Sequence, residues 1–186
     1  MLRTDISLSR ERAALTVIEL VLVMAVVGIL TSLLVVAFSQ TRVDSKIKRA
    51  NADLHVIQVG LEQYRGRFGD YPRIPDIDGG AVFPDPVTSN NSYLLNALSG
   101  KIGPSHAVVD DVPSMLNHGL LTLSNPEDGY PMEDAVDNEL VDPWGHAYAY
   151  DYRPKDAGWL MFGYKLYSFG PDGSDDSGEG DDIVAE

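Results

Sequence analysis

Residues 15–38 read LTVIELVLVMAVVGILTSLLVVAF, an apolar run in which Glu19 is the one charged residue. A helix rises ~1.5 Å per residue, so this run would form a helix of roughly 36 Å. That length is enough to cross a hydrocarbon core of ~30 Å. Because a short basic leader precedes the run, we predict a transmembrane helix over residues 15–40 rather than a helix buried in a soluble domain.

Glu19 needs an explanation, because a carboxylate inside an apolar helix costs roughly 3 kcal/mol at the bilayer centre and less near an end. If the chain is cut between Ala14 and Leu15, the new α-amino group lies four residues before Glu19 and carries the opposite charge. The pair can form within one chain or between neighbouring chains of an assembly. The alternative is that Glu19 lies at the membrane interface without a function.

The order of these residues resembles the class III signal of type IV pilins and pseudopilins: a leader, a small residue, the cut, a hydrophobic residue, Thr, two aliphatic residues and Glu. The resemblance implies cleavage after Ala14 by a prepilin peptidase, N-methylation of Leu15, and a role for Glu19 in registering one subunit against the next in a helical filament. The family usually has Gly where this chain has Ala14. An ordinary secretory signal would have a shorter apolar region with its cleavage site behind it. An uncleaved signal anchor is the other alternative.

The composition points to one head domain, residues 41–186, beyond the apolar run. The formal net charge of −14 argues against nucleic acid as the main partner, since binding to its backbone needs clustered Lys and Arg. The chain has no Cys, so something other than disulfides should hold its loops. Basic residues flank the apolar run on both sides and leave its orientation ambiguous. The family resemblance places the leader in the cytoplasm and the head in the periplasm.

After Phe38, apolar residues recur at spacings of three and four, which predicts an amphipathic helix over residues 41–69. The apolar stripe consists of Val43, Ile47, Ala50, Leu54, Ile57, Leu61, Tyr64 and Phe68. The facing positions are polar: Lys48, Arg49, Asn51, Asp53, Gln58 and Glu62. A helix packed on a small sheet is favoured over a coiled coil, because strand-like segments follow.

Residues 70–140 are rich in Gly and Pro and read as loops, with short helices predicted at 92–98 and 113–121. This region suggests no chemistry. Residues 146–152 and 159–169 are predicted to form a hairpin around a loop at 154–158. The predicted fold class is therefore α+β, with a long N-terminal helix, transmembrane in its first half, packed on a small C-terminal antiparallel sheet.

The segment 170–183, GPDGSDDSGEGDDI, combines carboxylates with flexible glycines. Calcium typically takes 6–8 oxygen ligands from such a loop. The EF-hand pattern fails, because the sixth and twelfth positions counted from Asp172 are Ser177 and Ile183 rather than Gly and Glu. On composition alone, a solvated acidic tail explains the segment as well as a calcium loop does.

A second resemblance concerns this end of the chain. DPWG at 142–145, the predicted hairpin, YSFGPDG at 167–173 and GEGDDI at 178–183 resemble the C-terminal half of the major pseudopilin of type II secretion systems. The resemblance covers residues 15–72 and 142–183 and implies one calcium ion. Its implied ligands are the side chains of Asp172, Asp181 and Asp182 and the backbone oxygens of Phe169 and Ser174. Asp175 and Asp176 replace a stretch that usually contains Gly and Glu, so the choice among the acids stays open.

Patterns typical of enzymes are absent from the sequence, which has no Cys nucleophile, no G-x-S-x-G, no Walker A motif and only isolated His residues. We therefore predict a non-enzymatic subunit of a type II secretion pseudopilus, a periplasmic filament that drives protein export across the outer membrane. Its expected partners are further copies of itself, minor pseudopilins, the inner-membrane assembly platform and prepilin peptidase. Its expected localisation is the inner membrane, single-pass, and then the pseudopilus. The alternatives are a type IV pilin for adhesion, motility or DNA uptake, and a signal-anchored periplasmic binding or enzymatic domain.

Overall fold

The computed structural model describes residues 16–75, 82–109, 112–128, 132–153 and 163–185, with the backbone alone at 33–41, 118 and 153. The protein is α+β, as predicted. It divides into two compact units, Met1–Arg42 and Val43–Glu186. The helix α1, Val17–Phe68, contributes residues to both units, and each unit is described separately.

In the first unit, the side chain of Thr16 caps the N-terminus of α1. Thr16 accepts a hydrogen bond at its Oγ1 from the backbone N–H of Glu19, over 3.3 Å. The pattern Thr-x-x-Glu is a sequence signature of helix N-termini. Glu19 also lies in the first turn, where the helix dipole favours a negative charge. The negative charge of Glu19 therefore lies at the end of the helix where it is electrostatically favourable.

The predicted membrane span is wrong. Among the described residues, no helix is both long enough and apolar enough to cross a membrane. The single-pass localisation in the inner membrane, which rested on residues 15–40, is withdrawn with it.

In the second unit, the apolar stripe predicted for α1 is confirmed from Ala50 to Tyr64, whereas Val43, the first residue of the predicted stripe, is 39% exposed. Ala50, Leu54, Ile57, Leu61 and Tyr64 are each at most 1% exposed, and they face the core of the head. Asp53, predicted on the polar face, is instead buried at 2% exposure. Its carboxylate accepts hydrogen bonds from Arg49 Nε over 2.7 Å and from the hydroxyl of Tyr148 over 3.2 Å.

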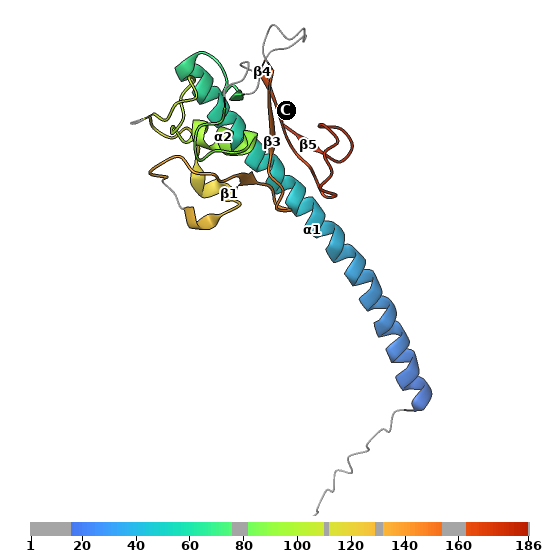
Figure 1. Ribbon diagram of the computed structural model, residues 1–186. Coiled ribbons are helices and arrows are strands. Elements are labelled where there is room, and N and C mark those ends of the chain that lie inside the picture. The colour runs from blue at the N-terminus through green and yellow to red at the C-terminus, as the bar shows by residue number, and fades with distance from the viewer. Residues whose placement is uncertain (1–15, 76–81, 110–111, 129–131, 154–162, 186) are drawn as a thin grey trace, which may run out of the picture. The chain divides into compact units, whose positions relative to one another are not determined.

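The described residues of the head form two small antiparallel sheets (Figure 1). The first has the order β3-β4-β5, formed by Ala149–Arg153, Gly163–Ser168 and Ile183–Val184. The second pairs β1, Thr122–Leu123, with β2, Leu140–Val141. The predicted hairpin is confirmed, with Tyr150 opposite Leu166 and Tyr152 opposite Tyr164. Its loop, 154–158, lies outside the described residues.

Three alternate tyrosines attach the first sheet to α1 and to the segment that follows it. Tyr148, Tyr150 and Tyr152 are between 1% and 4% exposed. Their hydroxyls donate to Asp53 Oδ2, to the carbonyl of Pro72 and to Asp70 Oδ2, over 3.2, 2.7 and 2.7 Å. The two-residue spacing puts all three side chains on one face of the strand, so each ring fills the core while its hydroxyl finds a polar partner.

The helix α2, Asn90–Leu98, confirms the helix predicted at 92–98. Ser89 caps it, since its side chain accepts the N–H of Ser92 over 3.0 Å. Asn91, in the first turn, donates from Nδ2 to the carbonyls of Leu140 and Tyr148. Its Oδ1 accepts the N–H of Leu140 over 2.7 Å. One buried amide therefore joins α2 to β2 and to the residue before β3.

The helix predicted at 113–121 is wrong. This segment contains only the 3₁₀ turn η2, His118–Leu120, and a second such turn, η3, spans Pro126–Asp128. The N–H of Met115 donates to the carbonyl of Leu98 over 2.8 Å, rather than to a residue of its own segment. Met115 and Leu116 are therefore buried in the core although they belong to no helix.

Asn91→Ala should lower the free energy of unfolding by about 3 kcal/mol, because it leaves buried backbone groups without partners. Asn90→Ala is the matched control, since Asn90 is the exposed neighbour in the same turn, and it should change stability by less than about 0.5 kcal/mol. Urea unfolding of both variants measures the difference. Equal losses would contradict the bridging role of Asn91.

Asp70 should make the stability of the head depend on pH in the acid range. Partial burial raises its pKa, but hydrogen bonds from Tyr152, the amide of Tyr71 and Arg73 outweigh burial and hold the pKa below its ordinary value. A carboxylate whose pKa is lowered by folding stabilises the folded state at pH values above its unfolded pKa, about 3.9 for Asp. This stabilisation is lost as the pH falls through the lower pKa of the folded state.

Asp70→Asn should therefore cost less than about 1 kcal/mol at pH 7, because Asp70 is 37% exposed and screened by solvent. The difference from wild type should shrink towards pH 3 in thermal unfolding at a series of pH values. Asp134→Asn, which removes an exposed carboxylate, is the control. A difference that stays constant with pH would count against the charge of Asp70.

Candidate metal centre

The acidic loop, residues 170–182, connects β4 to β5, and its two ends touch. Gly170 has φ +65°, and a Cβ there would collide with the carbonyl oxygen of Asp181. Only glycine therefore fits this position. The N–H of Asp172 donates to Asp181 Oδ2 over 3.1 Å, which is a second contact between the two ends of the loop. We call these contacts of Gly170 and Asp172 with Asp181 the neck of the loop.

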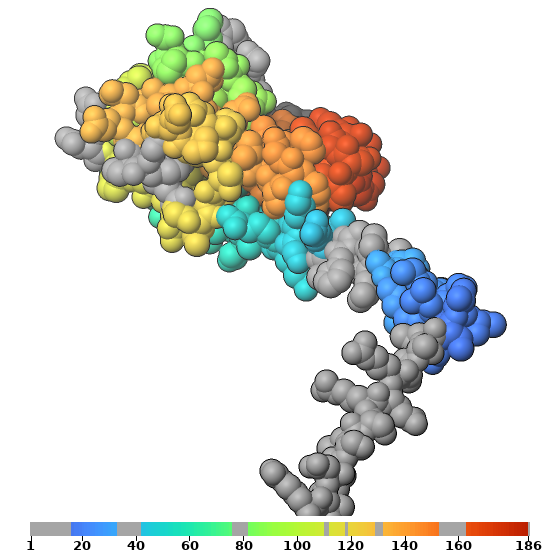
Figure 2. Space-filling model, turned by 90° about the horizontal axis from the view of Figure 1, so that it is seen from below, coloured from blue at the N-terminus to red at the C-terminus, as the bar shows by residue number. Residues whose placement is uncertain are grey.

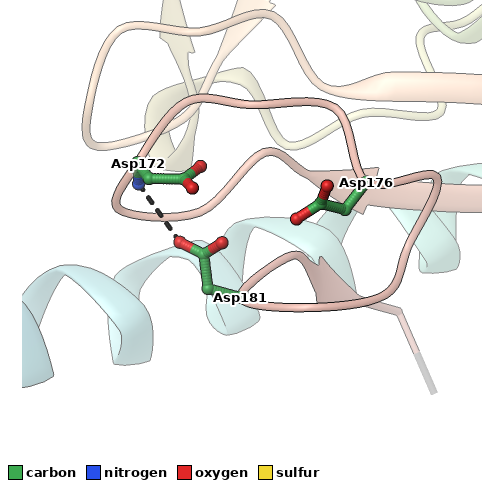
Figure 3. Close-up of side chains that lie close together, drawn as sticks. All are labelled: Asp172, Asp176 and Asp181. Carbon is green, nitrogen blue, oxygen red and sulfur yellow. Dashed lines mark hydrogen bonds between the residues drawn. The ribbon is translucent and has the colours of Figure 1, made fainter.

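Three carboxylates of the loop point towards one another (Figure 3). One oxygen from each of Asp172, Asp176 and Asp181 lies within 4.8 Å of the other two, and all three side chains are exposed. The dashed line in Figure 3 marks the bond from the amide of Asp172 to Asp181. This arrangement concentrates negative charge on the open side of the loop.

The electrostatic cost of this cluster is seen at Asp176. Desolvation and the repulsion of the carboxylates of Asp182, Asp172, Asp181 and Asp175 raise the pKa of Asp176 above its ordinary value. Repulsion between like charges disfavours the ionised form. A divalent cation among these oxygens would reverse the effect, because it would replace repulsion by attraction.

Of the five ligands implied by the resemblance, the structure brings two together in the cluster. Asp172 and Asp181 belong to the cluster, while Asp182 turns its Oδ2 to the N–H of Gly178 over 2.7 Å. The other oxygen of Asp182, Oδ1, is buried without a hydrogen-bond partner among the described residues. Ser174 donates its N–H to Asp172 Oδ1 over 2.7 Å, and the ring of Phe169 packs edge-on against Tyr167.

Asp176 joins the cluster, although the resemblance did not single it out. The sequence alone could not choose between Asp175 and Asp176. Asp175 is engaged elsewhere, because its Oδ1 accepts the hydroxyl of Tyr167 and the N–H of Ser177. A tyrosine eight residues earlier in the chain thus distinguishes the two neighbouring acids.

The donor set fits a hard divalent cation. Carboxylate oxygens are the ligands that Ca²⁺ and Mg²⁺ take, whereas softer metals favour His and Cys. The buried, unpartnered Oδ1 of Asp182 is a further oxygen at the same loop. Asp172, Asp176 and Asp181 would hold the ion, which would neutralise their repulsion and tie the two halves of the loop together.

The other residues singled out in the sequence lie at the start of the chain. Ala14 and Leu15, the predicted cleavage and methylation positions, lie outside the described residues. Glu19 lies in the exposed first turn of α1, as described above. No protein-family model, no curated protein and no solved structure matches this chain.

Asp172→Asn should abolish the thermal stabilisation that calcium gives the wild-type chain. At a calcium concentration 100 times the dissociation constant, that stabilisation should be about 2.7 kcal/mol. Glu179→Gln removes the same charge from the same loop at a residue outside the cluster and should keep the effect. Melting curves in EDTA, Ca²⁺ and Mg²⁺ measure it. A wild-type melting temperature that is the same in all three solutions would exclude the site.

Proposed function

We propose that this chain is a non-enzymatic structural subunit of a filament of the pseudopilin type, which acts in type II protein secretion. In this proposal, copies of the chain pack the first part of α1 together in the filament, while the heads form its surface. Calcium bound to the acidic loop stabilises each head for assembly. Minor pseudopilins, an assembly platform and prepilin peptidase are the further partners that the resemblance implies.

The observation that carries the proposal is the apolar surface at the start of α1. Every described side chain from Val17 to Ser32 is exposed, and the large apolar ones are between 48% and 80% exposed. A contiguous apolar surface of this kind marks an interaction site rather than a solvated face. Packing against the same segment of other copies would remove it from water.

Glu19 supports the proposal through its charge. It is the one ionisable residue among the exposed side chains of this segment. Burying its carboxylate between copies would be costly without a cationic partner. The α-amino group of Leu15, released by cleavage after Ala14, would be that partner on a neighbouring copy and would fix the register between subunits.

The negative charge of the chain argues against nucleic acid as its partner. The chain carries 28 acidic and 14 basic residues, and most described basic side chains already have partners within the head. Arg49 pairs with Asp53, Arg73 pairs with Asp70, and Arg65 bonds the hydroxyl of Tyr71. Little positive charge is left to engage a phosphate backbone.

Glu19→Gln removes the charge of Glu19 without disturbing the cap of the helix. The backbone N–H that donates to Thr16 Oγ1 is kept, so the helix should begin as before. Loss of a buried charge pair costs about 2–5 kcal/mol, which corresponds to more than a tenfold rise in the critical concentration for assembly. Sedimentation and electron microscopy of filaments, with circular dichroism for helix content, test this.

Asp44→Asn is the matched control, because Asp44 is an exposed carboxylate further along the same helix. It should assemble like wild type. Filaments that form equally well with Gln at position 19 would refute the charge pair. A wild-type chain that stays monomeric with its leader removed would refute the filament itself.

A further inference from the structure

The turn after β2 contains a fully buried carboxylate. Asp142 opens the motif DPWG, and its side chain is 0% exposed. Its Oδ1 accepts the backbone N–H groups of Trp144, Gly145 and His146 over 2.9, 2.9 and 3.0 Å. A single oxygen therefore holds the whole turn in one conformation.

The second oxygen of Asp142 reaches the strand that leads into the acidic loop. Oδ2 accepts the hydroxyl of Ser168, the last residue of β4, over 2.6 Å. Ser168 is 0% exposed, and its Oγ accepts the N–H of Gly170 over 3.1 Å. Because the hydroxyl proton of Ser168 points to Asp142, a lone pair of the same oxygen is directed at the N–H of Gly170.

Gly170 is the residue at which the acidic loop closes. It lies against the carbonyl of Asp181, and the amide of Asp172 bonds the carboxylate of Asp181. The turn also touches the loop at its first bend, where a Cβ on Gly173 would lie 2.6 Å from Cε1 of His146. Figure 2 shows the orange residues that follow β2 packed directly against the red C-terminal residues.

We infer that Asp142 and Ser168 are positioning residues for the cation site of the acidic loop. The relay from Asp142 through Ser168 to Gly170 fixes the neck, so that Asp172 and Asp181 face each other before an ion arrives. Side chains that orient ligands without touching the metal commonly set its affinity. This inference rests on the cation binding in the proposed function, and it gives the DPWG motif its role.

Ser168→Ala is the direct test, because it cuts the relay without changing any charge. Its matched control is Ser92→Ala, which removes another fully buried hydroxyl, bonded to the carbonyl of Val136. Calorimetric titration of the full chain with CaCl₂ should show an affinity at least about tenfold lower for Ser168→Ala. Ser92→Ala should bind calcium like wild type, although both variants melt at lower temperature in EDTA.

Amide hydrogen exchange in EDTA gives a readout that needs no metal. The amides of Gly170 and Asp172 should exchange faster in Ser168→Ala than in Ser92→Ala. If Ser168→Ala does not fold, Asp142→Asn replaces it, since Asn keeps the volume but presents a donor to Ser168. Its control is Asp53→Asn, at a buried carboxylate bonded to Arg49 and Tyr148.

Wild-type calcium affinity or unchanged exchange in Ser168→Ala would overturn the inference. A wild-type chain that binds no calcium would overturn both the inference and the cation site. A chain that binds calcium, loses affinity in Ser168→Ala and forms no filament would leave the inference standing and refute only the filament.

Discussion

The tyrosine hydroxyls that join the sheet to α1 are the constraint on which the head depends. Tyr148, Tyr150 and Tyr152 bury their rings in the core and bond Asp53, Pro72 and Asp70. A purely apolar contact would let the sheet slide along the helix. Hydrogen bonds at three fixed partners remove that freedom, because a shifted strand would leave buried polar atoms unpaired. The position of β4, and with it the start of the acidic loop, follows from this register.

Buried asparagines do for the long middle region what disulfides do in many small domains. Asn91, Asn96 and Asn138 are between 0% and 4% exposed. Asn96 bonds both the N–H and the carbonyl of Val136, and Asn138 accepts the N–H of Asn125 and donates to its carbonyl. An amide offers a donor and an acceptor at once, so each asparagine imitates a strand neighbour for an otherwise irregular segment. In a chain without Cys, these buried amide hydrogen bonds hold the loops in place.

Periodicity predicted the parts of this fold that are locally encoded. The stripe from Ala50 to Tyr64 and the hairpin followed from repeats of 3.6 and 2. Asp53 was misplaced because its burial depends on Tyr148, which lies 95 residues away. The helix expected at 113–121 failed for a similar reason, since Met115 bonds Leu98 and not its own segment. The acidic loop was predicted from composition, but the cluster of three carboxylates depends on the closed neck at Gly170 and on Tyr167, which engages Asp175.

The neck of the acidic loop links the positions of the loop carboxylates to the buried residues of the head. Free carboxylates repel, and a flexible chain would relax by moving them apart. Here Gly170 lies on Asp181, and the fully buried Ser168 and Asp142 fix Gly170 in turn. The repulsion therefore persists in the folded chain, and together with desolvation, the larger cause, it raises the pKa of Asp176. A cation that relieved this repulsion would gain affinity from the rigidity of the neck, because the loop would not be reorganised on binding. On this argument the buried polar relay, more than the number of acids, would set the affinity of the loop for a cation.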